Sequence, residues 1–454
     1  MSKEKGIFAL STPLVISFWL RAAFQWIDPA FATTLKDAAG NSLGDASLAA
    51  IGLTLPFEFL MTAVWVGASN GLTSRLAAAM GSGNNDQVEK LKGAARRIIW
   101  VLNGAFLLLA FGIAFLAEKV GLDPVVASQF RIYATVLIGG SAFTSFWSIL
   151  PDSLVKAHHD TRTTMWAGIL STGLNVLLNT IFTFALGWGI FGIAFSTVLG
   201  RVAGLGYAIY RAALHEQRRI AETNPEGPTT ESTPFRPIHA ILGIAFPSGM
   251  AYVLMALESQ IINFFLARLP DATSQLAAWT LFERGVRFLA IPLIATSVAM
   301  LPLVARRFGQ KDRSGIRKEI RLAQLGSVGY TILFVLPITL LLGPWVAGKL
   351  SGSPETESAV VATLWIIPLS VLVMIPVMLL RAVFDGIQKP RAGLIVALLR
   401  AFLLVGPLVW LGIEWATRNG HHPTVGAAWG FSIGVGAASI LLWFWLQREL
   451  KKET

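Results

Sequence analysis

The sequence contains no cysteine, and only 14% of its residues are charged. The missing cysteine excludes disulfides, thiolate metal sites and thiol catalysis. The charged fraction is too low for a soluble domain, in which about 25% of residues are charged. Hydrophobic residues make up 54% of the 454-residue chain, and the charges lie in short segments between long apolar runs. This pattern is typical of a polytopic helical membrane protein.

Catalytic and nucleotide-binding motifs are absent as well: the sequence has no HExxH, GxSxG or Walker-type loop. We therefore expect a protein that is not an enzyme and is not driven directly by ATP. The net charge of +11 could suggest nucleic acid, but the basic residues lie in alternate loops, which is the positive-inside pattern. We expect a monomer in the lipid bilayer of the inner (cytoplasmic) membrane, with both termini cytoplasmic and no nucleic-acid partner.

The hydropathy pattern predicts an all-α fold with about twelve transmembrane helices. Their approximate bounds are 8–34, 46–79, 95–117, 125–156, 163–187, 190–212, 238–266, 273–305, 322–347, 357–384, 392–415 and 424–446. A polar segment rich in Pro, Thr and Glu interrupts the pattern and indicates a cytoplasmic linker. The predicted organisation is a six-helix bundle over 1–212, a linker over 213–237 and a second six-helix bundle over 238–454. Five prolines inside apolar spans each remove a backbone hydrogen bond and can kink their helices: Pro292, Pro302, Pro337, Pro368 and Pro376.

The two halves of the chain resemble each other in three blocks that occur in the same order. These blocks pair 8–28 with 242–262, 48–86 with 276–312, and 155–179 with 385–409. Because six spans separate the copies, both halves have the same orientation across the membrane. Parallel repeats of this kind are a transporter design in which the site lies at the repeat interface.

Asp28 is the first candidate site residue, because it lies in an apolar span and shares a helix face with Arg21 and Gln25. A carboxylate at the bilayer centre costs at least ~2.5–3.5 kcal/mol and usually marks an ion or substrate path. Two structural alternatives are a static pair with Arg21 and a helix-end cap near Pro29.

Several segments together resemble the multidrug and toxic compound extrusion (MATE) family. They are Pro13 and Asp28 in the first span, LAAIGL (48–53), GSGN (81–84), LNVLLNTIFTFALGWGIFGIAFST (174–197) and FDGIQKPRAG (384–393). The resemblance implies two six-helix bundles that work by alternating access. It also implies an antiporter that exports organic, in particular cationic, compounds and takes H+ or Na+ as its coupling ion, with no other cofactor.

The resemblance is to the prokaryotic DinF-type branch of this family, and it implies a cation-coupling site at Asp28, Asn175, Asn179 and Thr197. Asn175 and Asn179 are one helical turn apart, so both can face Asp28. The branch has Asp where this chain has Asn179. Asp28 is then the one carboxylate of the matched set, which favours protons over sodium.

A second polar cluster is expected in the seventh span, with Glu258, Gln260 and Asn263 in a substrate or ion role. Gln25 and Tyr252 are further candidates for substrate contact. The alternative for Glu258 is a structural pair with Arg284 or Arg287.

Two other features remain: a histidine-containing loop and a set of arginines near the spans. We expect His158, His159 and Asp160 to lie in a solvated loop, because a metal site needs three or four converging ligands. A lipid-linked precursor flippase is the alternative function. It depends on a cationic cavity, for which the candidates are Arg21, Arg201, Arg284, Arg287 and Arg400.

Overall fold

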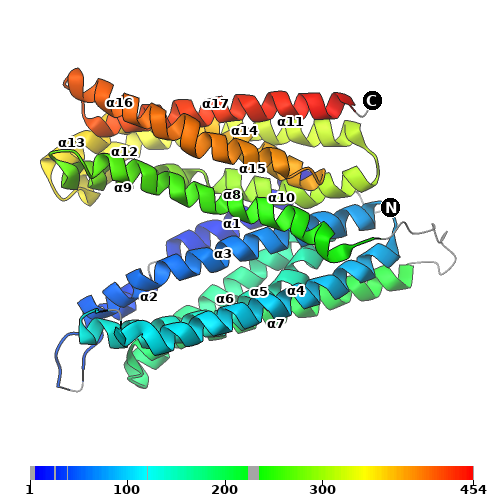
Figure 1. Cartoon of the computed structure of the whole chain (residues 1–454), viewed down its shortest axis with the longest axis horizontal. Coiled ribbons are helices and arrows are strands. Elements are labelled where there is room, and N and C mark those ends of the chain that lie inside the picture. The colour runs from blue at the N-terminus through cyan, green and yellow to red at the C-terminus, as the bar shows by residue number, and fades with distance from the viewer. Residues whose placement is uncertain (1–5, 25–26, 38, 120, 223–234, 453–454) are drawn as a thin grey trace. The chain divides into compact units, whose positions relative to one another are not determined.

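The computed structural model describes the whole chain except residues 1–5, 25–26, 38, 120, 223–234 and 453–454 (Figure 1). Every regular element in the described residues is a helix. Those of the first half are α1 (Ile7–Phe24), α2 (Ile27–Ala32), α3 (Gly44–Gly81), α4 (Asn85–Leu116), the short 3-10 helix η1 (Ala117–Lys119), α5 (Pro124–Ala157), α6 (Thr161–Thr180), the π-helical segment η2 (Ile181–Ala185) and α7 (Gly189–Glu222).

The second half continues in the same way. Its helices are α8 (Pro237–Leu266), α9 (Ala272–Leu289), α10 (Ile291–Gly309), α11 (Arg313–Tyr330), the π segment η3 (Thr331–Val335), α12 (Leu336–Leu350), α13 (Pro354–Thr363), α14 (Ile366–Gly386), α15 (Arg391–Leu398), the π segment η4 (Leu399–Val405), α16 (Gly406–Arg418) and α17 (Pro423–Lys452).

Twelve helical stretches of the described chain are long and apolar enough to cross a membrane, which confirms the predicted number. Their bounds differ where helices continue beyond the apolar run. The third span begins at Asn85, ten residues before its predicted start, because the Asn84 side chain caps it by accepting a hydrogen bond from the Gln87 amide at 3.0 Å. The predicted eighth span is divided into α9 and α10, which meet at Ala290.

Proline explains several of the helix interruptions. Pro292 and Pro368 lie in the first turns of α10 and α14, where the missing N–H costs nothing. Pro337 follows η3, and Pro407 follows η4. In a regular α-helix each ring would meet the carbonyl four residues earlier, inside the π segment. The wider π turn provides the space. Pro302 and Pro376, in contrast, remain inside α10 and α14.

The described chain divides into two compact units, residues 16–245 and residues 1–15 with 246–454. In the first unit, α5 packs against α3, α4 and α7, and α6 packs against α7. In the second, α17 packs against α14 and α16, and α14 also packs against α10. The linker expected over 213–237 is partly helical, because α7 continues to Glu222, and residues 223–234 lie outside the described part of the chain.

Large apolar side chains cover the outer surface of the helices. Leu108 and Leu341 are 73% and 77% exposed, and Phe111 and Phe444 are nearly as open. Such a surface would be a liability in water, but it matches the hydrocarbon of a bilayer.

Candidate functional site

Asp28 lies in the first turn of α2, and its carboxylate faces α6 and α7. The Asn179 Nδ2 donates to one carboxylate oxygen at 2.8 Å, and the Thr197 hydroxyl donates to the other at 2.8 Å. In the described residues Arg21 forms no ion pair with Asp28. Both oxygens therefore accept hydrogen bonds from neutral donors.

The other predicted members of the site join this network through Ser196, a residue that the sequence analysis missed. Asn175 Nδ2 donates to the Thr197 hydroxyl oxygen at 2.8 Å and approaches that of Ser196 at 3.3 Å. Ser196 is fully buried and donates to Asn179 Oδ1 at 2.8 Å. The four predicted residues thus lie together, and Ser196 connects the two amides of α6.

Two glycines of α7 allow this close arrangement. A Cβ on Gly200 would meet the Ser171 carbonyl oxygen and lie 3.1 Å from the Asn175 Cβ. A Cβ on Gly204 would lie 2.7 Å from the Ala167 carbonyl oxygen. Small residues four apart let membrane helices approach closely. The Gly200–Gly204 spacing therefore brings Thr197 within reach of Asn175.

The orientation of the Asn179 amide shows what an Asp at this position would change. Because the Asn179 oxygen accepts from Ser196, its nitrogen is directed at Asp28. A carboxylate in its place has no hydrogen to donate when ionised, and two carboxylates so close would share a proton. With Asn179, Asp28 is therefore the one acid of this hydrogen-bond network.

A second carboxylate, Glu58 of α3, lies in the electrostatic surroundings of Asp28. Its oxygen is 3.5 Å from the Arg201 guanidinium of α7, and Arg201 also donates to the Ser141 hydroxyl of α5. Tyr133 of α5 interacts with Asp28 too. Glu58, Ser141 and Tyr133 were not predicted from the sequence as neighbours of the site.

Glu258 of α8 has a different environment from the one predicted for it. Its carboxylate accepts a hydrogen bond from Arg400 Nε at 2.7 Å, and both side chains are about 95% buried. The expected alternative partners, Arg284 and Arg287, were wrong: Arg287 pairs with Glu283 at 2.6 Å. Glu258 is thus part of a buried ion pair between α8 and η4.

Among the described residues, no hydrogen bond joins Gln260 or Asn263 to Glu258. Gln260 is exposed, whereas Asn263 and Tyr252 are half-buried on α8. Gln25 lies outside the described residues. The substrate role predicted for these four residues stays a prediction.

The loop predicted around His158, His159 and Asp160 is not solvated, and that prediction was wrong. Asp160 is 6% exposed and caps α6; it accepts hydrogen bonds from Thr163, from Arg211 at 3.0 Å and from His215 at 2.8 Å. Burial alone would raise the pKa of Asp160, but the donors His215, Thr163 and Arg211 outweigh it and hold that pKa well below its usual range.

A neighbouring cluster extends this network. Glu216 of α7 accepts from Lys92 at 2.9 Å, from His158 at 3.0 Å and from Arg219 at 2.9 Å, and the rings of His158 and His215 are stacked. These contacts tie the ends of α4, α5, α6 and α7 together. The network therefore has a structural role. This role was not predicted, because the histidines and Asp160 had been considered only as metal ligands.

Comparison with known proteins agrees with this architecture. The family model described as MatE matches residues 37–181 and 247–411, about two thirds of the chain. A probable multidrug resistance protein NorM of Synechocystis sp. is 25% identical, covering 100% of this chain and 96% of the relative. A FAD transporter of Shewanella oneidensis is 21% identical, covering 82% and 81%. The structure of the Vibrio cholerae MATE transporter VcmN in its bent form has a TM-score of 0.85 at 23% identity, covering 98% and 97%.

Proposed function

This chain belongs to the MATE family of multi-pass membrane transporters, which are not enzymes, and we propose that it is a secondary active antiporter that exports small organic compounds. Transport would proceed by alternating access and be coupled to inward movement of a cation at Asp28. We also propose that the protein is a monomer in the bacterial inner membrane, with both termini in the cytoplasm.

One observation carries the coupling role: the carboxylate of Asp28 is held within a membrane span by hydrogen bonds from neutral groups alone, Asn179 and Thr197. When Asp28 takes up a proton and becomes neutral, none of these hydrogen-bond partners is left as an unbalanced positive charge. Thr197 can also reverse its role, because its hydroxyl lies 3.3 Å from the Ile193 carbonyl oxygen. It can then donate to Ile193 and accept from a protonated Asp28.

The same geometry favours a proton over sodium. Sodium needs several converging oxygens, whereas the Asn179 nitrogen is directed at Asp28 and the Asn175 nitrogen at Thr197. Both amides would have to turn to present oxygens to an ion. A proton requires the rotation of one hydroxyl.

Small organic compounds as a class are the proposed substrates. The relatives include proteins named for multidrug resistance and one named for FAD transport. Our preference for organic cations depends on the family resemblance, as does the place of this chain in the DinF-type branch.

Three of the five arginines on which the flippase alternative depends already have carboxylate partners. Arg201, Arg287 and Arg400 pair with Glu58, Glu283 and Glu258. A cavity that holds a pyrophosphate group needs cations whose charges are not already matched.

Everted membrane vesicles test the proposal. Energised vesicles should accumulate a cationic dye, and a protonophore should abolish the accumulation, whereas replacing sodium by choline should not. Asp28→Asn should remove gradient-driven accumulation while the protein remains folded. The matched control is Asp86→Asn, whose side chain is 65% exposed and pairs with Lys90 on the helix surface.

Two outcomes contradict parts of the proposal. Unchanged gradient-driven transport by Asp28→Asn would show that coupling occurs elsewhere. Loss of transport in choline, with resistance to the protonophore, would replace the proton by sodium and keep Asp28 as the site.

A further inference from the structure

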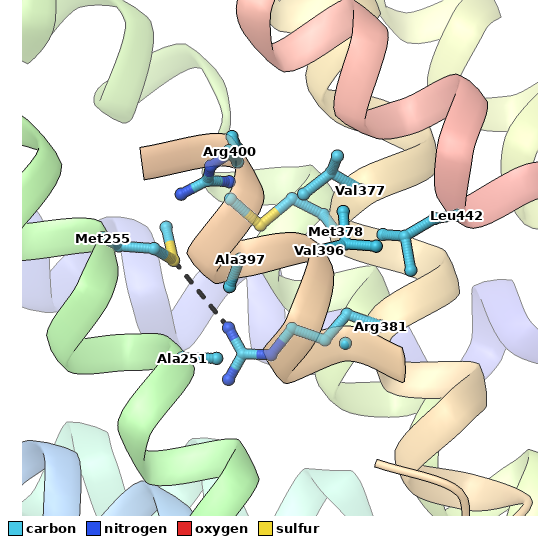
Figure 2. Close-up of a pocket in the computed structure, with 10 residues that line it drawn as sticks. Ala251, Met255, Val377, Met378, Arg381, Val396, Ala397, Arg400 and Leu442 are labelled. Carbon is cyan, nitrogen blue, oxygen red and sulfur yellow. Dashed lines mark hydrogen bonds between the residues drawn. The ribbon is translucent and has the colours of Figure 1, made fainter. Parts of the chain in front are cut away.

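The pocket drawn in Figure 2, in the unit formed by residues 1–15 and 246–454, has no room for an organic ligand. Its cavity volume is about 20 Å³, which is the room that one water needs. The charges of the two arginines that line it are balanced as well. Arg400 pairs with Glu258 at 2.7 Å, and Arg381 has Asp385 one helical turn along α14. The outer surface of this unit is therefore the better candidate for a further interaction.

Three exposed basic residues form a basic face in the first three turns of α11: Arg317, Lys318 and Arg321. Arg317 and Arg321 are four positions apart, and Lys318 and Arg321 are three apart. Side chains at these spacings are neighbours on a helix surface, with about 5–6 Å between their Cβ atoms. The three positive charges therefore lie close together.

The acidic residues of the same segment are already paired with another side chain. Arg307 binds both of them, Asp312 at 2.7 Å and Glu319 at 2.9 Å. Glu319 is 4% exposed and also accepts a hydrogen bond from the Ile7 amide at 3.2 Å. Among the residues that the structure describes, no carboxylate forms an ion pair with any member of the basic face. The protein itself thus leaves these three charges uncompensated.

The basic face leads directly into an exposed apolar surface. Leu322 follows Lys318 by four positions, Leu325 follows Arg321 by four, and the two leucines are 38% and 60% exposed. The candidate span that begins with α11 has 38 residues, Arg313–Leu350. At 1.5 Å per residue it is ~57 Å long, whereas the hydrocarbon core of a bilayer is about 30 Å thick. Since charged side chains avoid hydrocarbon, the extra length at the basic end places the basic face at the depth of the lipid headgroups.

The corresponding helix of the first half lacks this basic face. Helices α4 and α11 both begin at the end of the second repeated block, each after an N-cap side chain. Counted from that cap, the three positions are Glu89, Lys90 and Gly93 in α4. Glu89 pairs with Arg219 at 2.6 Å, and Lys90 pairs with Asp86 at 2.6 Å. The fold therefore does not require a basic face here, and the one on α11 is specific to the second half.

Uncompensated cations beside an apolar surface match the two parts of an anionic phospholipid. We propose that the basic face of α11 binds the headgroup of an anionic phospholipid. The phosphate would lie on the guanidinium groups of Arg317 and Arg321, whose planar N–H donors fit phosphate oxygens, and the acyl chains along Leu322 and Leu325. A zwitterionic lipid brings its own ammonium group to these cations and should bind more weakly. This lipid site goes beyond the proposed exporter function and does not depend on coupling at Asp28.

Native mass spectrometry of the purified full chain in detergent tests the proposal, because it resolves the first lipid that binds. The probes are dioleoyl phosphatidylglycerol and, as the zwitterionic control, dioleoyl phosphatidylcholine. Arg321→Gln should weaken phosphatidylglycerol binding about fivefold, the contribution of one basic residue near an anionic lipid surface, and leave phosphatidylcholine unchanged. The matched control is Lys90→Gln, which removes the same charge from the corresponding helix, where Asp86 already balances it. This control should leave the affinity for phosphatidylglycerol essentially unchanged.

A second arm distinguishes a lipid from a free anion. Glycerol 3-phosphate carries the phosphate without acyl chains, so it should compete at least roughly tenfold more weakly than phosphatidylglycerol. Leu325→Asn should weaken phosphatidylglycerol and leave glycerol 3-phosphate unaffected. Equal competition by the two probes would assign the basic face to a free anion and overturn the lipid proposal.

Equal affinity for the two lipids, or unchanged phosphatidylglycerol binding by Arg321→Gln, would also overturn it. Equal weakening by Arg321→Gln and Lys90→Gln would show that only the total charge of the protein matters, and the basic face would then be no site. Should Arg321→Gln fail to fold, Arg317→Gln replaces it with the same expected results. These measurements need no transport, so their failure would leave the exporter proposal standing.

Discussion

The Glu258–Arg400 pair allows a decisive test of whether Glu258 has a structural or a transport role. The two side chains are 5% and 6% exposed, and the distance between Arg400 Nε and the carboxylate oxygen is 2.7 Å. Replacing Glu258 by Gln leaves a buried guanidinium without its counter-charge. Breaking a buried pair in this way costs ~3–5 kcal/mol of unfolding free energy.

Removing both charges together should leave the free energy of unfolding nearly unchanged. Glu258→Met with Arg400→Met removes both charges and fills the space with apolar groups, and such replacements are often neutral or stabilising by up to ~4 kcal/mol. The control is Glu414→Gln, which breaks the exposed Glu414–Arg418 pair. An exposed pair contributes ~0–1 kcal/mol.

Unfolding in detergent, followed by intrinsic tryptophan fluorescence, gives the stabilities of the wild type, Glu258→Met, Arg400→Met and the double variant, which together form a double-mutant cycle. A coupling energy below ~1 kcal/mol would refute the structural role, because a pair this buried must couple more strongly. If Glu258→Gln instead keeps its stability and loses dye transport in vesicles, Glu258 has the transport role predicted from the sequence.

Three further changes probe the other unit. Gly200→Ala should cost ~1–3 kcal/mol in thermal stability and reduce proton-driven transport. The control is Gly206→Ala, whose Cβ meets no atom within 4 Å and which should change neither quantity. Equal effects of the two variants would show that α6 and α7 are not closely packed at Gly200. Asn179→Asp places a second acid beside Asp28, so the pair of carboxylates should keep a shared proton up to higher pH than Asp28 does alone. The pH profile of transport should therefore move to the alkaline side. An unchanged profile would show that Asn179 does not face the coupling site. Asp160→Ala should cost roughly 2–4 kcal/mol. Because the folded-state pKa of Asp160 is depressed, this stability should be complete above about pH 4 and decline as pH falls further; a loss that appears only near pH 7 would contradict it.

The number and type of helices followed from the sequence because hydropathy responds to the length of apolar runs. Helix ends could not be predicted from hydropathy, because a polar first turn such as that of α4 is helical although it lies outside the apolar run. The expected kinks at Pro292 and Pro337 coincide with the start of α10 and the end of η3. The position of Pro337 did not predict the π form of η3, which depends on how the helix avoids the clash between the proline ring and the carbonyl four residues earlier.

The residues around Asp28 were predicted through the family resemblance, whereas their connections were not. Ser196 adjoins Thr197, so a search for hydroxyls next to the matched position would have found it. The Arg400–Glu258 pair joins residues 142 positions apart, and only the rule that intramembrane charges need partners pointed to it. Asp160 precedes a helical run and has the pattern of an N-cap, a signal that a search for metal ligands overlooked.

Each half carries an acid on its first span, half-buried at Asp28 and buried at Glu258. The partner of that acid decides what it can do. In one unit Asp28 meets the neutral side chains of Asn179 and Thr197. In the other Glu258 meets the guanidinium of Arg400. Protonating Glu258 would leave a buried positive charge without its partner, at a cost of several kcal/mol, whereas protonating Asp28 leaves only neutral neighbours in its hydrogen-bond network. Two copies of one architecture therefore differ in the cost of gaining a proton, and this difference favours Asp28 as the acid that changes its charge during transport.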